Sequence, residues 1–190
     1  RSWSPRLTVS WQATDTLMPY LNIARGQVPG TFNDTVPKTA TGEDDERYRV
    51  VDEAVVWNYE VGLRGRSGDG RGRYALAAYY LDVRDQQATT IVDLGDGRTA
   101  TVLDNVGRIA VNGLELEVEM QLTERLYSAL SYSWTDSEIR RDLSIDQADL
   151  LGGNGSNEAL ETLGNVAGQK TPRVPKHAAG IQLEHRQRVG

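Results

Sequence analysis

Three carboxylates at every second position, Glu115, Glu117 and Glu119, are the residues of this sequence best placed to do chemistry. Successive side chains of a β-strand point to opposite faces, so this spacing puts all three on one face. Three carboxylates in a row could bind a cation or another ligand. Alternatively, the same residues could form a polar wall that contacts only water. We favour the solvated wall, because a strand that is apolar on one face usually turns its polar face to water.

A second group of acids is the run Glu43–Glu46. It could bind a cationic ligand, or bridge lipopolysaccharide through divalent ions. We favour a solvated loop here as well, because blocks of like charge usually remain in water.

Other chemistry has little support. His177 and His185 share one face of a predicted strand but lie far apart, and no carboxylate pair flanks them at metal-ligand spacing. We therefore predict no metal site and no cofactor. No G-x-S-x-G elbow surrounds any serine, so we predict no catalytic residue and no enzyme activity.

Composition narrows the classes of protein. The 190 residues carry a net charge of -6, which disfavours a nucleic-acid partner because phosphate binding needs a basic surface. The absence of cysteine excludes disulfides and thiolate metal sites. The mean hydropathy of -0.51, with no apolar run near ~20 residues, excludes a transmembrane helix but leaves a transmembrane barrel open, because barrel strands are only half apolar.

The strand that carries the three glutamates is the clearest element of the chain. From Asn112 onward, one face is apolar, with Leu114, Leu116 and Val118, while the glutamates occupy the other. The run from Ile109 to Leu122 exceeds the ~5–6 residues of an ordinary strand and suits a tilted crossing of a bilayer.

Similar alternation predicts seven strands in all. Of these, the fourth is expected to present a continuous apolar face through Ala75, Ala77, Tyr79, Leu81 and Val83. The strands are Arg6–Gln12, Met18–Ala24, Trp57–Arg64, Arg73–Ala88, Ile109–Leu122, Leu126–Asp136 and Lys176–Arg186.

The predicted connections alternate in length. Short turns at Ala13–Leu17, Ser67–Gly72 and Thr123–Arg125 alternate with longer loops, which are Gly26–Val56, Ile91–Asn105 and Ser137–Pro175. Bacterial outer-membrane barrels have short periplasmic turns and long extracellular loops. Aromatic residues near the long-loop ends of the strands suit the girdle of such a barrel; they are Trp57, Tyr79, Tyr80, Tyr132 and Trp134. The alternative is a soluble antiparallel sandwich, which also alternates but has shorter strands.

Several segments resemble TonB-dependent outer-membrane receptors. The segment Trp57–Gly65 resembles the "NYE-x-G-x-(K/R)-G" strand of that family, and Arg73–Gln87 resembles its "AxYxxDxxDQ" strand. Asn105–Gly107 with Asn112–Glu117 resembles the "NxG…GxE" strand, and Tyr20–Asn33 resembles a further segment. Together these matches cover about two thirds of the chain.

The resemblance implies an all-β fold, in which residues 1–190 form one segment, about seven strands, of an antiparallel transmembrane barrel of roughly 22 strands. The plug domain and the terminal strands are expected to be absent from it. The implied function is energy-coupled uptake of a ferric siderophore, cobalamin or oligosaccharide through the bacterial outer membrane.

The implied partners are outer-membrane lipid and lipopolysaccharide, an extracellular small-molecule ligand, and the inner-membrane TonB complex through the plug. We expect Glu115, Glu117 and Glu119 to face the lumen and the loops Gly26–Val56 and Ser137–Pro175 to hold the unidentified ligand-binding residues. A soluble β-sandwich binding module and a passive porin-like barrel remain the alternatives. Detergent dependence would separate the first of these from a barrel.

Overall fold

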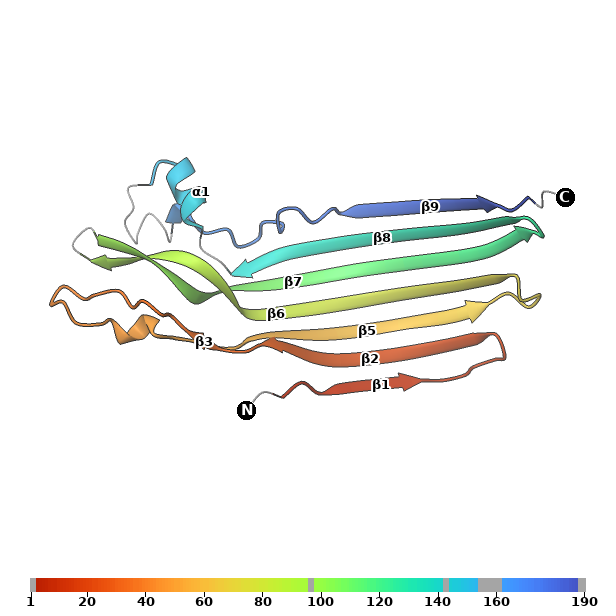
Figure 1. The fold of residues 1–190 in the computed structure, drawn as a ribbon, viewed down its shortest axis with the longest axis horizontal. Helices are drawn as coiled ribbons and strands as arrows, with labels where there is room; N and C mark the ends of the chain where they lie inside the picture. The colour runs from red at the N-terminus through yellow and green to blue at the C-terminus, as the bar shows by residue number, and fades with distance from the viewer. Residues whose placement is uncertain (1–2, 96–97, 142–143, 154–161, 188–190) are drawn as a thin grey trace.

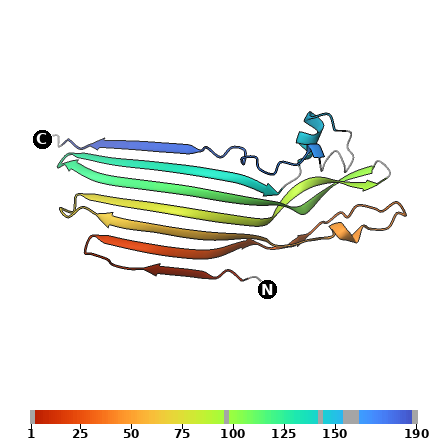
Figure 2. The same ribbon diagram turned by 180° about the vertical axis from the view of Figure 1, so that it is seen from behind.

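A single antiparallel sheet dominates the computed structural model, which describes residues 3–95, 98–141, 144–153 and 162–187 (Figures 1 and 2). Its seven strands lie in the order β1-β2-β5-β6-β7-β8-β9, which confirms the predicted number. The strands are β1 (Arg6–Ser10), β2 (Leu17–Val28), β5 (Ala54–Arg66), β6 (Gly72–Gly95), β7 (Arg98–Thr123), β8 (Leu126–Arg141) and β9 (His177–His185).

The register gives the sheet two unlike faces. Leu116 of β7 stands opposite Leu76 of β6 and Tyr132 of β8, and these residues belong to what we call the apolar face. Glu117 stands opposite Ala75 and Ser131, on what we call the acidic face. The apolar face extends over every strand of the sheet and includes Leu7, Val9, Leu21, Val61, Leu114, Leu130, Ile181 and Leu183.

No second layer covers the apolar face within the described part of the chain (Figures 1 and 2). Val61 is 54% exposed and Ile181 is 74% exposed, values that a soluble sandwich would not give to its core side chains. The buried apolar residues lie instead in the first long connection and in the parts of β7 and β8 near the long loops, and include Val36, Val51, Val102 and Ile139.

The prediction of which residues form the apolar face of β6 is wrong. Ala75 stands opposite Glu117 and Ala77 opposite Glu115, so the series from Ala75 to Val83 lies on the acidic face. The residues of β6 that join the apolar face are Tyr74, Leu76, Ala78 and Tyr80. Both faces of this stretch are apolar in sequence, so its alternation cannot say which face joins that of the neighbouring strand.

Tyr79 therefore does not belong to the aromatic girdle in which it was predicted to lie. Its ring lies over Gly113 on the acidic face, where an added Cβ would come within 2.1 Å of the ring. The other predicted girdle residues, Trp57, Tyr80, Tyr132 and Trp134, do share the apolar face. Tyr59 joins them, because its ring stacks on both Trp57 and Tyr80.

The prediction of a loop over Ile91–Asn105 is also wrong. β6 and β7 remain paired as far as Gly95 and Arg98, because threonine and branched aliphatic residues favour a strand here. The register shifts near Gln86, where Asp85 has a φ of 53°, and the hairpin twists beyond this point (Figure 1). Such bulges bend a strand and increase its twist.

The other two long connections are shorter than predicted. β2 continues to Val28 and β5 begins at Ala54, so residues 29–53 form the first connection. It contains β3 (Thr31–Phe32), the 3-10 helix η1 (Glu46–Tyr48) and β4 (Val50–Val51). The second begins after Arg141, so Ser137 lies within β8, and it contains the helix α1 (Ile145–Leu150).

The three short turns are confirmed. In the second, Gly70 has a φ of 72°, and Asp69 accepts a hydrogen bond from the amide of Arg71. In the third, the Thr123 hydroxyl accepts from the amides of Arg125 and Leu126. The sheet therefore has a short-turn rim and a long-loop rim at opposite ends (Figure 1). No described helix is long and apolar enough to cross a bilayer.

Candidate functional site on the acidic face and at the long-loop rim

The three predicted glutamates lie together on the acidic face of β7. Glu119 forms an ion pair with Arg73 of β6, with 2.7 Å between the carboxylate oxygen and the guanidinium nitrogen. Glu115 and Glu117 are exposed and have no ion-pair partner among the described residues. Both carboxylates are therefore available to a partner that approaches this face.

A hollow of about 480 Å³ adjoins these carboxylates. Ala75 and Ala77 form part of its floor, and their small side chains leave room between the glutamates and the side chains of β2 and β5. On the far side, the Tyr20 hydroxyl donates a hydrogen bond to Glu60 at 2.6 Å, and the Arg64 guanidinium lies 5.1 Å from the centre of the Tyr20 ring.

The hollow has a surplus of negative charge. Four carboxylates line it, those of Glu60 and of the three glutamates of β7, against the two guanidinium groups of Arg64 and Arg73. It is open and polar, and no histidine or serine lines it among the described residues. This surface can attract a basic partner through its charge.

Alternation along Trp57–Arg64 puts Glu60 and Arg64 on one face of that strand, but it does not connect them with Glu115. The register makes that connection, because it stacks the polar sides of β2, β5, β6 and β7 on one face. Arg73 belongs to the same alternating series as Ala75, so only the register shows that it lies beside Glu119.

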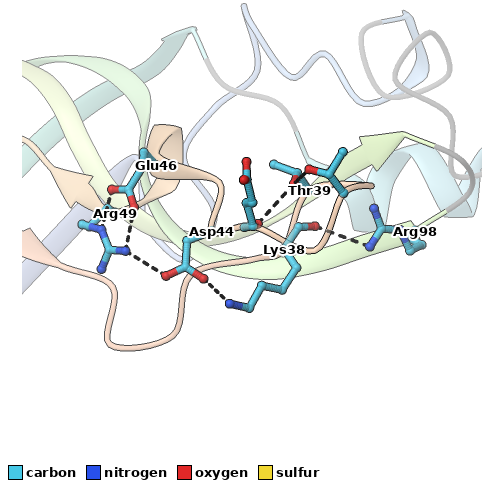
Figure 3. Close-up of polar contacts among 8 residues, drawn as sticks. Lys38, Thr39, Asp44, Glu46, Arg49 and Arg98 are labelled. Atoms are coloured by element: carbon cyan, nitrogen blue, oxygen red, sulfur yellow. Dashed lines mark hydrogen bonds and ion pairs between the residues drawn. The ribbon is translucent and has the colours of Figure 1, made fainter.

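The acidic run Glu43–Glu46 lies at the long-loop rim, where its charges are largely paired (Figure 3). Asp44 contacts both Lys38 and Arg49, and Glu46 contacts Arg49 at 2.5 Å. Asp45 pairs with Arg47 at 2.6 Å. These pairs make the run part of a folded, charge-neutralised structure.

These cations lower the pKa of each of the three carboxyl groups. A hydrogen bond from Lys38 is the main cause of the lowered pKa of Asp44. Hydrogen bonds from Arg47 and Arg49 lower the pKa of Asp45 and of Glu46 respectively. All three groups therefore stay ionised at neutral pH and keep their ion pairs.

Side-chain amides attach the first long connection to the β6–β7 hairpin. Asn33 donates to the carbonyl of Leu103 at 2.8 Å and accepts from its amide at 3.0 Å, as a strand neighbour would. Asn105 bonds both the amide and the carbonyl of Asp52 in the same way. Val51, which is 1% exposed, is buried beside these contacts. These contacts tie the first long connection to the hairpin.

The remaining candidates lie apart from this surface. His177 is on the apolar face, where its Nδ1 lies 2.8 Å from the Tyr132 hydroxyl, and His185 stands opposite Leu126 near the short-turn rim. Within the described ranges, no three His, Cys, Asp or Glu side chains converge as metal ligands would. Of the predicted loop Ser137–Pro175, residues 142–143 and 154–161 lie outside the described residues.

Comparison with known proteins finds one family model that matches the chain and several proteins that are similar to it. The family model described as TonB dependent receptor-like, beta-barrel, matches residues 1–189. The metal-pseudopaline receptor CntO of Pseudomonas aeruginosa is 26% identical to this chain over 151 residues, which are 80% of this chain and 19% of the relative. The chain thus spans about a fifth of the length of the curated relatives that it matches.

Solved structures share the fold. The ferric yersiniabactin uptake receptor FyuA of Yersinia pestis aligns over 95% of this chain and 22% of its own, with a TM-score of 0.64 and 20% identity. The siderophore receptor PiuA of Acinetobacter baumannii aligns over 95% of this chain and 23% of its own, with a TM-score of 0.66 and 17% identity. The ferripyoverdine receptor of Pseudomonas aeruginosa aligns over 98% and 20%, with a TM-score of 0.60 and 13% identity.

Proposed function

The chain belongs to the family of TonB-dependent receptor-like β-barrels, whose place is the bacterial outer membrane, and on this premise we propose that it forms part of an energy-coupled uptake receptor. In this proposal the apolar face contacts lipid, while the acidic face, with Glu115, Glu117 and Glu119, lines the lumen. The observation that carries it is the separation of the two faces over all seven strands, with no layer over the apolar one in the described part.

The rest of the receptor supplies the other parts of this function. We assign residues 1–190 to one segment of a barrel of about 22 strands, with a plug domain contributed by another part of the polypeptide. The inner-membrane TonB complex acts through that plug. The hollow beside Glu115 and Glu117, with its surplus of negative charge, suits the basic side chains of such a plug.

The ligand that we propose is a metal chelate of the siderophore class. Support comes from the relatives, whose names give metal-pseudopaline, ferric yersiniabactin and ferripyoverdine as what they bind or take up. The ligand would contact the loops Gly26–Val56 and Ser137–Pro175, since binding residues collect on loops held by a rigid scaffold. The ordered rim at Asn33 and Asn105 lowers the entropy cost of binding.

Uptake by the complete receptor tests this proposal. A strain without receptors of its own is given the gene and then supplied with radiolabelled iron bound to hydroxamate, catecholate or mixed-ligand siderophores. We expect uptake of one class that stops when an uncoupler removes the proton gradient. Unselective uptake that continues with the uncoupler would favour a passive porin-like barrel. A protein that stays monodisperse in water without detergent would favour the soluble sandwich.

A loop deletion tests the proposed mouth. The amide of Asp45 lies 2.8 Å from the carbonyl of Pro37, so residues 38–44 can be replaced by two glycines with little disturbance of the ends. We expect the deleted receptor to assemble as a heat-modifiable barrel and to lose chelate binding. A matched replacement in the short turn Ser67–Gly72 should leave binding intact. Unchanged binding after the long-loop deletion would contradict the assignment.

A further inference from the structure

Two arginines stand side by side on the apolar face, close to the long-loop rim. Arg84 of β6 and Arg108 of β7 are direct register partners, and their side chains are 52% and 48% exposed. Cβ atoms of such partners lie about 4.5–5.5 Å apart, and like charges there repel each other. A basic pair in this position therefore needs a reason.

Asp82 holds the two guanidinium groups in place. Its carboxylate accepts from Arg84 Nε at 2.7 Å and from Arg108 Nε at 2.9 Å, and its side chain is only 5% exposed. Asp82 thus accepts one hydrogen bond from Arg84, at Nε, and two from Arg108, at Nε and Nη2, while Arg84 Nη2 lies 2.6 Å from the same carboxylate. The other N–H donors of both arginines have no hydrogen-bond partner among the described residues.

The net charge of this group is positive. Asp82 contacts both guanidinium groups, Asp85 acts on Arg108 only through its charge, and on β8 the neighbouring Glu138 is paired with Arg140 at 2.9 Å. Arg141 stands opposite Arg108 in the register and is exposed. The aspartate therefore positions the two arginines and leaves positive charge for an anion to neutralise.

The depth of the two arginines relative to the membrane surface indicates which anion they bind. Trp57 stands opposite Asp82, and its ring continues the stack that runs through Tyr59 to Tyr80. Aromatic belts lie at the level of lipid headgroups. Arg84 is two residues farther toward the rim, which is about 7 Å along a strand at ~3.4 Å per residue. This places the guanidinium groups beside headgroup phosphates.

We propose that Arg84 and Arg108, positioned by Asp82, form a clamp for the phosphate of an outer-leaflet glycolipid. Arginine suits this role because its planar fork matches the oxygens of a phosphate bidentately. The clamp lies on the apolar face, on the opposite side of the sheet from the hollow, so its partner arrives from the membrane. The inference rests on the barrel orientation in the proposed function, and it adds a binding site to the outer wall.

Lipid binding by the complete receptor in mixed micelles tests the clamp. The probe is radiolabelled lipid A with both phosphates, compared with the same lipid after phosphatase treatment. We expect the double variant R84Q/R108Q to bind the phosphorylated lipid about 30-fold more weakly, because each basic residue near an anionic headgroup contributes about 1 kcal/mol. The control R66Q/R125Q removes two exposed arginines at the short-turn rim and should bind as the wild type does.

Three further outcomes decide the matter. R84K/R108K keeps the charge and loses the fork, so we expect an affinity between those of the wild type and the glutamine variant. Equal affinity of the wild type for lipid A and its dephosphorylated form would overturn the clamp, and this comparison needs no variant to fold. Displacement of lipid A by 10 mM inorganic phosphate would assign the site to a free anion instead.

Iron uptake separates this inference from the proposed function. R84Q/R108Q should still import the chelate, because the clamp lies outside the lumen. A receptor that imports the chelate and shows no preference for phosphorylated lipid overturns the clamp alone. A receptor that binds the phosphorylated lipid and imports nothing overturns the proposed function alone.

Discussion

Two adjacent alanines provide the sharpest test of the faces. Ala77 stands opposite Glu115 on the acidic face, and Ala78 stands opposite Leu114 on the apolar face. Both lie near the middle of the stretch from Gly72 to Asp82, which at 11 residues matches a tilted crossing of the bilayer. The same substitution at both positions therefore changes one variable, the side of the sheet on which the new charge lies.

Ala78→Arg should cost about 2–4 kcal/mol of barrel stability, the usual cost of arginine on the lipid face near the midplane. Ala77→Arg should cost under about 1 kcal/mol, because its guanidinium would enter the polar hollow beside Glu115. The free energy of unfolding of the complete barrel in phospholipid vesicles, from urea titration, measures both. The difference corresponds to a change of roughly 5- to 1000-fold in the equilibrium constant.

The sequence alone predicted the reverse order, since it placed Ala77 on the apolar face of its strand. Equal costs at the two positions would refute the assignment of the faces to lipid and lumen. A larger cost for Ala77→Arg would refute the register between β6 and β7. A variant of the exposed turn, Gly68→Arg, controls for the effect of adding a charge anywhere.

Three further predictions concern local contacts. Gly113→Ala should cost about 1 kcal/mol in the same titration, because its Cβ meets the Tyr79 ring, and the cost should vanish in a Tyr79→Ala background. Asn33→Ala leaves the amide and carbonyl of Leu103 unpaired, so it should weaken loop docking by about 1–3 kcal/mol, seen as faster proteolysis of residues 29–53; equal cleavage rates would contradict this. Because the pKa values of Asp44, Asp45 and Glu46 are lowered in the folded rim, their contribution to its stability is complete above the ordinary carboxyl pKa and is lost as pH falls below it. Hydrogen exchange of residues 38–49 should therefore be slow at pH 7 and accelerate below about pH 4, and a pH-independent rate would contradict the ion pairs.

The ordered rim and the open hollow have different consequences for a receptor. The first long connection is tied to the β6–β7 hairpin by Asn33 and Asn105, so a ligand meets a surface that is already shaped. Glu115 and Glu117 have no ion-pair partner among the described residues, so their charges remain available on the acidic face. In the receptor that we propose, the rim selects the ligand and the acidic face contacts the plug.

Much of the fold was predictable from the sequence. Alternation over Leu114–Leu122 showed one apolar and one polar face, because side-chain direction along a strand has a period of two. Turn residues such as Asp69 and Gly70 marked the short-turn rim, since a positive φ is accessible to glycine without strain. The seven strands, the two unlike rims and the family follow from these local signals.

The long-loop end was less predictable. The segment Ile91–Asn105 contains Gly95, Asp96 and Gly97 and was predicted to be a loop, but β6 and β7 remain paired as far as Gly95 and Arg98. The sequence also shows the acidic run without its partners, because the pairing of Asp44 with Lys38 and Arg49 depends on how the connection folds back.

What only the tertiary structure decided is how the faces of different strands combine. Each strand has two possible faces, and a shift of one residue in register exchanges them, so Ala75, Ala77 and Tyr79 could join Leu116 or Glu117 with equal local propensity. The hydrogen-bonded register between β6 and β7 placed them with Glu117, and thereby created the hollow. The same register set Arg84 opposite Arg108 above a buried Asp82. Sequence determined the pattern within each strand, and pairing between strands determined which side chains meet, because register is set by the long-range contacts of the whole sheet.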